Sequence, residues 1–582
     1  TNQTIDAVVS IPDTPEVAPP TAPLNLQPSV IVFTCLIYAL AWILLMWPER
    51  FPLGRPGIAL VFASLVCAMR GFAGSPVDIF AKIDPDPIVL LFGLMLVNTY
   101  LEDTGLWNHL GRLLDDKNPE VMLVKICVAS AVISALFLND TTCIILTPIV
   151  LKLSAERKVR KVLPYLLAVS TSSNIGSSLT ITGNPQNALI ASLCPSIDFI
   201  GFMETMAMPV AVGLCLNILI LWVWFRDDLC YDDPDTPHCE WKQEWQLGRS
   251  LSSKRLDRSN SDGSPSSSEE SPSKNGLSRT SSCELIDIDE SVTSLWVTKQ
   301  LYWMLVCMTV LCMLVGWFLG LRTHETAVAT GATLMVARAA LRLLNTCGVQ
   351  NPRAFSETET EFVIRHIDFP LLLLFMGQFV LIGAVVDTGV PQQTFHMTLG
   401  NCSDDLSSSL VCIFFFSGIV LVLSNIISNV PVILMLYPLL ADQPPESVKE
   451  VWYICAWVAT VAGNLTMLGS AANLIVAQIA TRERQFEYNA TNVTKFSFIP
   501  TIFIAVIGVL VMPQLISMWA TNILHSSPLL FGALVLLAIC LFLVSRVLRS
   551  SHKHSQESSR SFAGDIELHQ GLVTPVYIDP ML

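Results

Sequence analysis

The amino-acid sequence predicts an all-α polytopic membrane protein with two inverted-topology repeats, each containing a re-entrant hairpin and a broken transmembrane helix. Three observations predict this fold class. The chain of 582 residues is 52% hydrophobic and only 14% charged, whereas roughly one quarter of the residues of a soluble protein are charged. Apolar runs long enough to cross a bilayer recur along the chain. Segments of the first half also reappear in the second half, with polar interruptions at matching places.

The apolar runs define the expected spanning segments. Two further apolar stretches, Val121–Leu153 and Leu406–Leu440, are interrupted at mid-length by polar clusters, and each is too long for one helix and too short for two full spans. We therefore expect both to be re-entrant hairpins. The predicted spans are Ser29–Trp47, Pro56–Arg70, Pro87–Asp103, Pro164–Ser192, Thr205–Phe225, Thr298–Leu319, Glu325–Leu343, Phe369–Thr388, Val451–Ala480, Phe498–Met518 and Pro528–Val544.

These segments divide the chain into domains. Residues 29–226 and 298–545 are the two transmembrane repeats. Residues 227–297 between them are Ser-rich and charged, and we expect them to form a disordered cytoplasmic loop because they have little apolar surface to bury. Residues 1–28 are expected to be an extracellular tail, and residues 546–582 a cytoplasmic tail.

Charge and cysteine content exclude several classes of protein. The net charge of −14 comes largely from acids in the tails and the central loop, so nothing indicates binding to nucleic acid. The 16 Cys residues are mostly scattered singly through apolar runs, which is typical of small buried side chains. The sequence has no CxxC pair, no HExxH motif and no close His cluster, so we expect no metal site, no cofactor and no enzyme activity.

Basic residues predict an orientation in the membrane. With the N-terminus outside, the cytoplasmic loops contain Arg50, Arg55 and the basic run RKVRK at 157–161. We expect a plasma-membrane protein whose Ser-rich loop and C-terminus lie in the cytoplasm. Asn401 in NCS and Asn2 in NQT then lie outside and are expected glycosylation sites. This orientation requires each hairpin to return to its own side.

Two pairs of segments relate the halves. IDPDPIVLLFGLMLVNTYLEDTGL from Ile83 aligns without a gap with IDFPLLLLFMGQFVLIGAVVDTGV from Ile367, and SALFLNDTTCIILTP from Ser134 aligns with SNIISNVPVILMLYP from Ser424. In the predicted topology the paired segments enter from opposite faces. Such duplication is typical of secondary transporters, which hold their solute near the midplane between discontinuous helices.

A third pair covers the broken helices. NIGSSLTITGNPQN from Asn174 pairs with NLTMLGSAAN from Asn464 if the first half carries four extra residues. Pro removes a backbone donor and Gly permits turned backbone, so these segments are expected to unwind and to turn polar groups toward a cavity; a simple kink packed by neighbouring helices is the alternative. The predicted solute-binding residues here are Asn174, Thr182, Gly183, Asn184, Pro185, Asn187, Asn464, Gly469, Ser470 and Asn473.

The hairpin tips supply further predicted solute-binding residues. Helix ends at a tip leave N–H and C=O groups unsatisfied, and these can hold a polar solute or a cation; the alternative is that Asn and Ser merely cap the turning helices. No Arg or Lys lies in either tip or either unwound segment, so the lining suits a small neutral polyhydroxylated solute or a weak anion. The tip residues are Asn139, Thr141, Ser428 and Asn429.

Asp140 is the ionisable residue most clearly at membrane depth in the first half. A carboxyl group there can change its protonation during a transport cycle, which makes Asp140 the candidate for proton coupling; a hydrogen-bonded structural Asp is the alternative. Asp103 and Asp387, each followed by Thr-Gly, are expected to mark helix ends. Asp84 and Asp368 precede Pro-flanked apolar runs and are expected N-caps.

Four motifs carry a resemblance to a known family. FLNDTTCIILTP, SSNIGSSLTITGNPQNALIA, SNVPVILMLYPLL and VATVAGNLTMLGSAANLIV resemble the signatures of plant-type silicon efflux transporters. These belong to the ion-transporter superfamily, with arsenite efflux permeases and, more distantly, sodium–dicarboxylate symporters. The resemblance covers most of the chain from Phe51 to Met518, without the Ser-rich loop and the tails.

The resemblance implies a function. It implies proton-coupled export of a small neutral oxyacid, silicic acid, with arsenous acid as a second solute, by a homodimer in the lipid bilayer. Asp140 aligns with the Asp of the family's Asn-Asp hairpin. The alternatives are an arsenite efflux permease, a sodium-coupled carboxylate or anion transporter, and a sensor that binds solute without flux and signals through its Ser-rich loop.

Overall fold

The computed structural model describes residues 24–46, 51–229, 288–347, 358–444, 447–485 and 487–512. All of these belong to the first of two compact units, Thr1–Pro513. Asn2, most of the Ser-rich loop, the predicted span Pro528–Val544 and the C-terminal tail lie outside the described residues.

The first half forms helices from α1 to α10, and within the described residues no strand is present. Pro lies in the first turn of α4, α6, α8 and α9, where its missing N–H is not needed. The elements are α1 (Pro28–Met46), α2 (Gly54–Phe72), α3 (Ile79–Lys82), α4 (Pro85–Asp103), α5 (Leu106–Leu114), α6 (Pro119–Leu136), α7 (Asn139–Arg157), α8 (Leu163–Ser177), the 3₁₀ turn η2 (Ile181–Gly183), α9 (Pro185–Leu193) and α10 (Phe199–Phe225).

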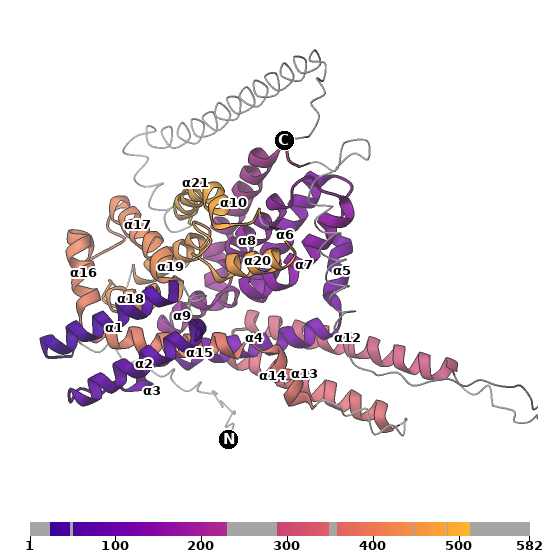
Figure 1. The fold of residues 1–582 in the computed structure, drawn as a ribbon, viewed down its shortest axis with the longest axis horizontal. Helices are drawn as coiled ribbons and strands as arrows, with labels where there is room; N and C mark the ends of the chain where they lie inside the picture. The colour runs from indigo at the N-terminus through magenta and orange to yellow at the C-terminus, as the bar shows by residue number, and fades with distance from the viewer. Residues whose placement is uncertain are drawn as a thin grey trace, which may run out of the picture. The chain divides into compact units, whose positions relative to one another are not determined.

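The second half repeats this order of elements (Figure 1). Its elements are α12 (Ile288–Phe318), α13 (Thr323–Cys347), α14 (Glu359–His366), α15 (Phe369–Val386), α16 (Val390–Leu399), the 3₁₀ turn η4 (Gly400–Cys402), α17 (Leu410–Ile427), α18 (Asn429–Ala441), α19 (Val448–Ala462), α20 (Ala471–Arg482) and α21 (Ala490–Leu510).

Membrane-length helices confirm the polytopic prediction. Within the described residues, 8 helices are long and apolar enough to cross a membrane. The breaks expected in the two polar-centred spans are confirmed, because α8 stops before α9 and α19 stops before α20. Each stretch was expected to be too short for two full spans, but its first arm, α6 or α17, has 18 residues and is itself of membrane length. Their re-entrant path stays a prediction.

The aligned residues of the two halves occupy matching structural positions. Asp84 and Asp368 are the N-caps of α4 and α15, each accepting a hydrogen bond from a backbone N–H of the first turn, as predicted. Gly105 and Gly389 begin α5 and α16 with φ of 72° and 71°, a left-handed conformation that suits Gly. The alignment from Ile83 to Ile367 therefore describes equivalent backbone.

Each half packs one of its helices against the other half. Helix α2 packs along α15, and α13 packs along α4 (Figure 1). The matched glycines Gly93 and Gly377 make these approaches close: a Cβ on Gly93 would lie 2.7 Å from Val328 N, and one on Gly377 would lie 2.9 Å from the Ala59 carbonyl carbon. Real side chains do not tolerate such distances, so both positions require Gly.

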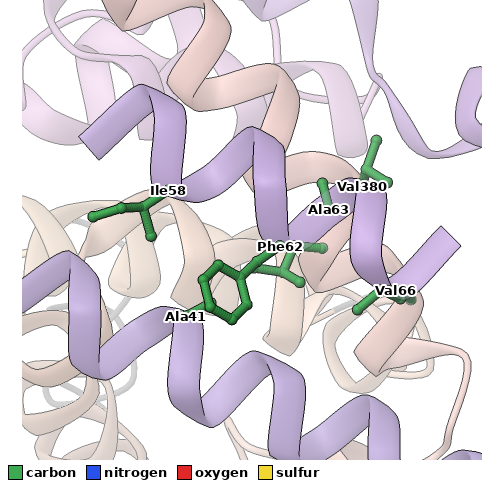
Figure 2. Packing of buried hydrophobic residues seen from close by; sticks show 8 residues of the cluster. Ala41, Ile58, Phe62, Ala63, Val66 and Val380 are labelled. Atoms are coloured by element: carbon green, nitrogen blue, oxygen red, sulfur yellow. The ribbon is translucent and has the colours of Figure 1, made fainter. Parts of the chain in front are cut away.

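An apolar cluster fixes α1, α2 and α15 against each other (Figure 2). Phe62 of α2 lies beside Ala41 of α1, and Val380 of α15 belongs to the same cluster. Small residues let the three helices approach closely, as in other membrane helix packings. The buried members are Ala41, Ile58, Phe62, Ala63, Val66, Val380, Leu381 and Ala384.

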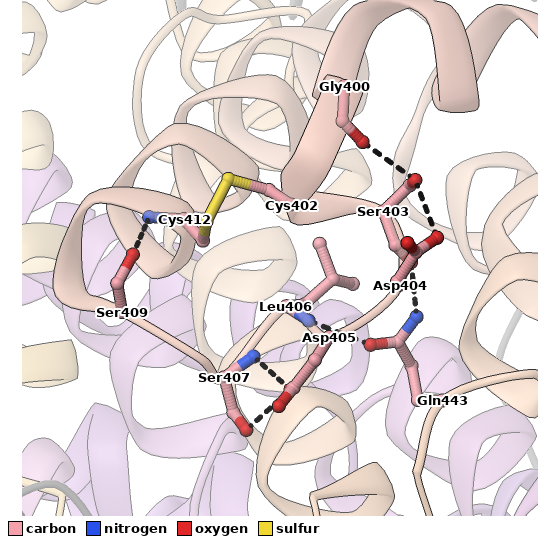
Figure 3. Close-up of a disulfide and its surroundings, with 10 residues drawn as sticks. All are labelled: Gly400, Cys402, Ser403, Asp404, Asp405, Leu406, Ser407, Ser409, Cys412 and Gln443. Atoms are coloured by element: carbon pink, nitrogen blue, oxygen red, sulfur yellow. Dashed lines mark hydrogen bonds between the residues drawn. A yellow bond between two sulfur atoms is a disulfide. The ribbon is translucent and has the colours of Figure 1, made fainter.

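A disulfide between Cys402 and Cys412 closes the loop from η4 to α17 (Figure 3). For this pair the expectation of isolated buried side chains is wrong. Cys402 stands in the polar stretch GNCSDDLSSS and Cys412 lies near the start of an apolar run, and their ten-residue spacing alone does not indicate a pair. Asn401, the predicted glycosylation site, is exposed next to Cys402.

Candidate functional site

The two hairpin tips share one backbone conformation, a residue with positive φ directly before the second arm. Leu138, before α7, has φ 103°, and Ser428, before α18, has φ 75°. Neither is Gly, so each occupies a conformation that costs about 1–3 kcal/mol and persists only where the surroundings impose it. Asn139 and Asn429 follow directly and begin the second arm of each hairpin. The tips are therefore equivalent turns that present an Asn from the first turn of a helix.

A chain of amides links the first tip to both broken helices. Asn139 Nδ2 donates to Asn174 Oδ1 at 3.0 Å, and Asn174 Nδ2 donates to Asn464 Oδ1 at 2.8 Å. Asn464 Nδ2 continues to the carbonyl of Thr171 at 3.1 Å, and Ser470 Oγ donates to Asn174 Oδ1 at 3.0 Å. All five residues are buried. Residues from both halves thus form one hydrogen-bonded polar layer inside the protein.

Each unwound segment is held by one Asn of the helix that follows it. Asn187 Nδ2 donates to the carbonyl oxygen seven residues earlier at 3.0 Å. It also donates to the carbonyl oxygen of Ser177, ten residues earlier, at 3.2 Å. In the second half, Asn473 Nδ2 donates to the carbonyl oxygen seven residues earlier at 3.0 Å and to that of Gly463, ten residues earlier, at 2.8 Å. Carbonyls freed by the helix breaks are satisfied in the same way in both halves.

These bonds correct the predicted register. They align SSLTITGNPQN from Ser177 with GNLTMLGSAAN from Gly463 without a gap, so the expected excess of four residues in the first half is wrong. Asn464 corresponds to Ser178 rather than to Asn174. Sequence matching placed the gap to pair identical Asn residues, whereas the backbone carbonyls that need a donor decide the true register.

A cavity of about 140 Å³ lies where both tips meet both unwound segments. The predicted residues that line it are Asn139, Asp140, Pro185, Ser428, Asn429, Gly469 and Ser470. The other predicted residues are not among its lining and lie buried in the protein: Thr141, Asn174, Thr182, Gly183, Asn184, Asn187, Asn464 and Asn473.

The residues away from the cavity have structural partners. Asn184 caps α9 through Asn187 N at 2.8 Å and its Nδ2 also contacts Thr460 Oγ1. Thr182 contacts Thr180 Oγ1 at 3.3 Å. A Cβ on Gly183 would lie 2.2 Å from the carbonyl oxygen of Ser177, so only Gly fits there. This second layer shapes the cavity without facing it.

Acceptor atoms are left open at both tips. Asn139 Oδ1 and Asn429 Oδ1 are buried and have no hydrogen-bond partner in the described chain, and the same holds for Asn187 Oδ1 and Asn473 Oδ1 behind them. Each of these oxygens can therefore accept a hydrogen bond from a group that is not part of the described chain. The two at the tips belong to residues that line the cavity.

The lining carries two charged groups, Arg55 and Asp140. Arg55, from the first turn of α2, and Asp368, the N-cap of α15, are the charged side chains whose fields act on Asp140. The charge pattern of the sequence predicts Arg55 in a cytoplasmic loop, so the predicted site has no basic residue. Helix α2 begins earlier than predicted, at Gly54, which brings Arg55 into the cavity wall.

Sequence reasoning missed other lining residues, namely Trp42, Gln378 and Asn425. Asn425 had a signal, because it lies in the matched segment SNIISN, four residues before Asn429. Its Nδ2 donates to the Ala462 carbonyl at 2.9 Å and its Oδ1 accepts from Thr466 Oγ1 at 3.1 Å, which ties the second hairpin to the second unwound segment. Gln378 also had a signal, because it is the single polar side chain of the apolar helix α15, whereas Trp42 lies in an apolar helix where no local pattern marks it.

Within the described residues no cluster of three or more His, Cys, Asp or Glu side chains is placed to hold a metal ion. The cavity wall is largely apolar and carries amide and hydroxyl side chains from both halves, with one acid and one base. It presents hydrogen-bond acceptors from both halves to whatever enters it.

Comparison with known proteins identifies the family. Residues 40–462 match the family described as CitMHS, citrate transporter. The chain is 30% identical over 503 residues to the silicon efflux transporter LSI3 of Oryza sativa subsp. japonica, covering 82% of this chain and 97% of that protein. It is 26% identical to a Dictyostelium discoideum protein named transporter arsB, covering 82% of this chain and 91% of that protein.

Among solved structures, the YdaH transporter of Alcanivorax borkumensis covers 85% of this chain and 99% of its own, with 14% identity and a TM-score of 0.41. The family match and the LSI3 similarity both extend over most of the described repeats, including both tips. The chain is therefore a multi-pass membrane transporter that belongs to the citrate transporter family.

Proposed function

We propose that this protein exports silicic acid in exchange for protons, with the solute held in the cavity between the hairpin tips and the proton carried by Asp140. The observation that supports the solute class is the pair of open amide oxygens, Asn139 Oδ1 and Asn429 Oδ1. A neutral polyhydroxylated acid supplies O–H donors to both. Such a solute would satisfy buried acceptors that are costly to leave unpaired.

The cavity's size and charge agree with a small neutral solute. Its volume is about 140 Å³, and its two charged groups have opposite signs. Asp140 is half-buried in the wall and faces the same space as the tip amides. A carboxyl group that meets solvent and solute in one cavity can exchange its proton when the solute enters or leaves. The similarity to a silicon efflux transporter supports the same solute.

Arg55 favours a second candidate function, the transport of a carboxylate or another anion. A guanidinium in the wall can bind an anion through charge-assisted hydrogen bonds, and the family is described by citrate. The open oxygens also suit a sodium ion, so sodium coupling accompanies this candidate. Arsenous acid, the third solute considered, presents the same hydroxyl donors as silicic acid and is supported by the similarity to arsB.

We also propose that the N-terminus lies outside the plasma membrane and the Ser-rich loop inside. This orientation puts Cys402 and Cys412 outside, where disulfides form and persist, and leaves Asn401 exposed on the same side for a glycan. It also puts Trp42 and Arg55, at facing ends of α1 and α2, on the cytoplasmic half. The cavity then lies toward the cytoplasm, as loading for export requires.

Flux into proteoliposomes distinguishes the candidates. Silicic acid, arsenite and citrate are offered one at a time, each under an imposed proton gradient, an imposed sodium gradient or neither. We expect silicic acid movement that the proton gradient accelerates and the sodium gradient leaves unchanged. Citrate movement driven by sodium, with no movement of silicic acid, would replace this proposal by the anion candidate.

A further inference from the structure

One hydrogen bond joins the first helix to the second hairpin tip. Trp42 Nε1 donates to the carbonyl oxygen of Ile426 at 2.6 Å. Ile426 lies in the last turn of α17, where helical carbonyls have no partner within the helix. Trp42 and Ile426 both line the cavity, and Ser428 and Asn429 follow within three residues. The indole therefore holds the backbone that immediately precedes two predicted solute-binding residues.

The position of this indole is fixed by packing. Ala41, the residue before Trp42, is fully buried in the apolar cluster with Phe62 and Val380 (Figure 2). That cluster joins α1 to α2 and α15, so it determines which face of α1 is turned toward these two helices. Trp42 consequently reaches the tip from a helix that packs against both α2 and α15 at the preceding residue.

The two tips are held by different means. The first tip is held by the first broken helix, through Asn139 to Asn174 and through Ser134 Oγ to the Ser173 carbonyl at 2.6 Å. The second tip is held through Asn425 and, from outside its own half, through Trp42. Its own Asn429 has an open Oδ1. The geometry of Ser428 and Asn429 thus depends on a contact that the first tip does not use.

We propose that Trp42 is a positioning residue, which sets the second hairpin tip for solute binding through its bond to the Ile426 carbonyl. This inference rests on the proposed function, because a Michaelis constant needs a transported solute. The Trp42→Phe variant keeps an aromatic ring in the cavity wall and removes the N–H donor. We expect the KM for silicic acid to rise about three- to tenfold, as the loss of one net hydrogen bond predicts, with kcat nearly unchanged.

Trp317→Phe is the matched control. Trp317 Nε1 donates to Thr326 Oγ1 over the same 2.6 Å, and Trp317 is fully buried between α12 and α13, away from the cavity lining. Its replacement should lower the Tm and leave the KM unchanged. An unchanged KM in Trp42→Phe, or an equal rise in both variants, would overturn the proposal.

Hydrogen–deuterium exchange supplies a readout that needs no transport. In Trp42→Phe the backbone amides of residues 424–430 should exchange faster than in the wild type, while those of the first tip, residues 134–140, should not change. Trp317→Phe should leave both tips at wild-type rates. Uniform protection of residues 424–430 in all three proteins would contradict the positioning role even if silicic acid were not the solute.

Discussion

Asp103 and Asp387 show how single residues connect the two halves. Each lies at the C-terminal end of a helix, where a negative charge opposes the helix dipole. Each is compensated by an Arg from the other half: Arg338 Nε donates to Asp103 Oδ2 at 2.8 Å, and Arg70 Nη1 donates to Asp387 Oδ2 at 2.9 Å. The prediction that they mark helix ends is confirmed, and the structure adds their partners.

The Asp387→Asn variant should be strongly destabilised. Arg70 is fully buried, and Asp387 also contacts Lys82, so loss of the carboxylate leaves two neighbouring cations without a counterion. Removing one partner of a buried pair costs about 3–5 kcal/mol. A lowered Tm of the purified variant in detergent measures this loss.

Asp103→Asn is the internal comparison. Its partner Arg338 keeps two bonds of 3.0 Å to Glu359 and packs over the Phe362 ring at 3.7 Å. The Asp103 side chain is also 30% exposed. We therefore expect a clearly smaller drop in Tm than for Asp387→Asn, and equal or reversed effects would contradict this account of the two pairs.

At the scale of elements, the bases of the two hairpins are closed by different chemistry. The first is closed by Arg157, at the end of α7, which binds Asp115 through two bonds of 2.6 Å. Hydrogen bonding from Arg157 lowers the pKa of the Asp115 carboxyl. The second is closed by Gln443, beyond α18, which accepts from Leu406 N at 2.8 Å and donates to the Ser403 carbonyl at 2.9 Å (Figure 3). The disulfide stabilises the same loop.

Replacing both Cys402 and Cys412 by Ser should lower stability. A disulfide that closes a loop of this length restricts the unfolded chain by about 3 kcal/mol. The double variant should have a lower Tm than the wild type, and a thiol reductant should lower the Tm of the wild type alone. If the reductant lowers both Tm values equally, the disulfide is not the source of the effect.

Much of each element was predictable from local sequence, and the exceptions have physical causes. N-caps, helix breaks and tip residues depend on neighbouring residues, so Asp84, Asp368 and the Gly- and Pro-containing segments marked them correctly. The cavity wall depends on helices far apart in the chain, so Trp42 and Arg55 carried no local signal. The register of the broken helices depends on which backbone carbonyls need a hydrogen-bond donor, and the amino-acid sequence alone does not reveal this.

At the scale of the whole molecule, each half packs one of its helices against a helix of the other half. Helices α2 and α13 each pack on a helix of the opposite half, at approaches that Gly377 and Gly93 make possible. Both tips and both unwound segments consequently border one shared cavity. Because Val430 takes the place of Asp140 in the second half, the two tips match in Asn139 and Asn429 and differ in the acid.

Under the proposed function, this asymmetry makes Asp140 the residue that carries the coupled proton. Asp140→Asn keeps the size and shape of the side chain and removes the group that ionises, so solute binding and folding should persist while proton exchange is lost. Asp442→Asn, which removes an exposed carboxylate beyond α18, is the matched control and should behave as the wild type.

The most direct test of the account is solute-driven proton movement. Proteoliposomes loaded with silicic acid are diluted into solute-free buffer, and a pH indicator inside them follows the lumen. For the wild type and Asp442→Asn, we predict acidification of the lumen as silicic acid leaves, and for Asp140→Asn, silicic acid exchange without acidification. Efflux from wild-type vesicles with no change of lumenal pH would contradict proton antiport, and undiminished acidification by Asp140→Asn would remove Asp140 from its role.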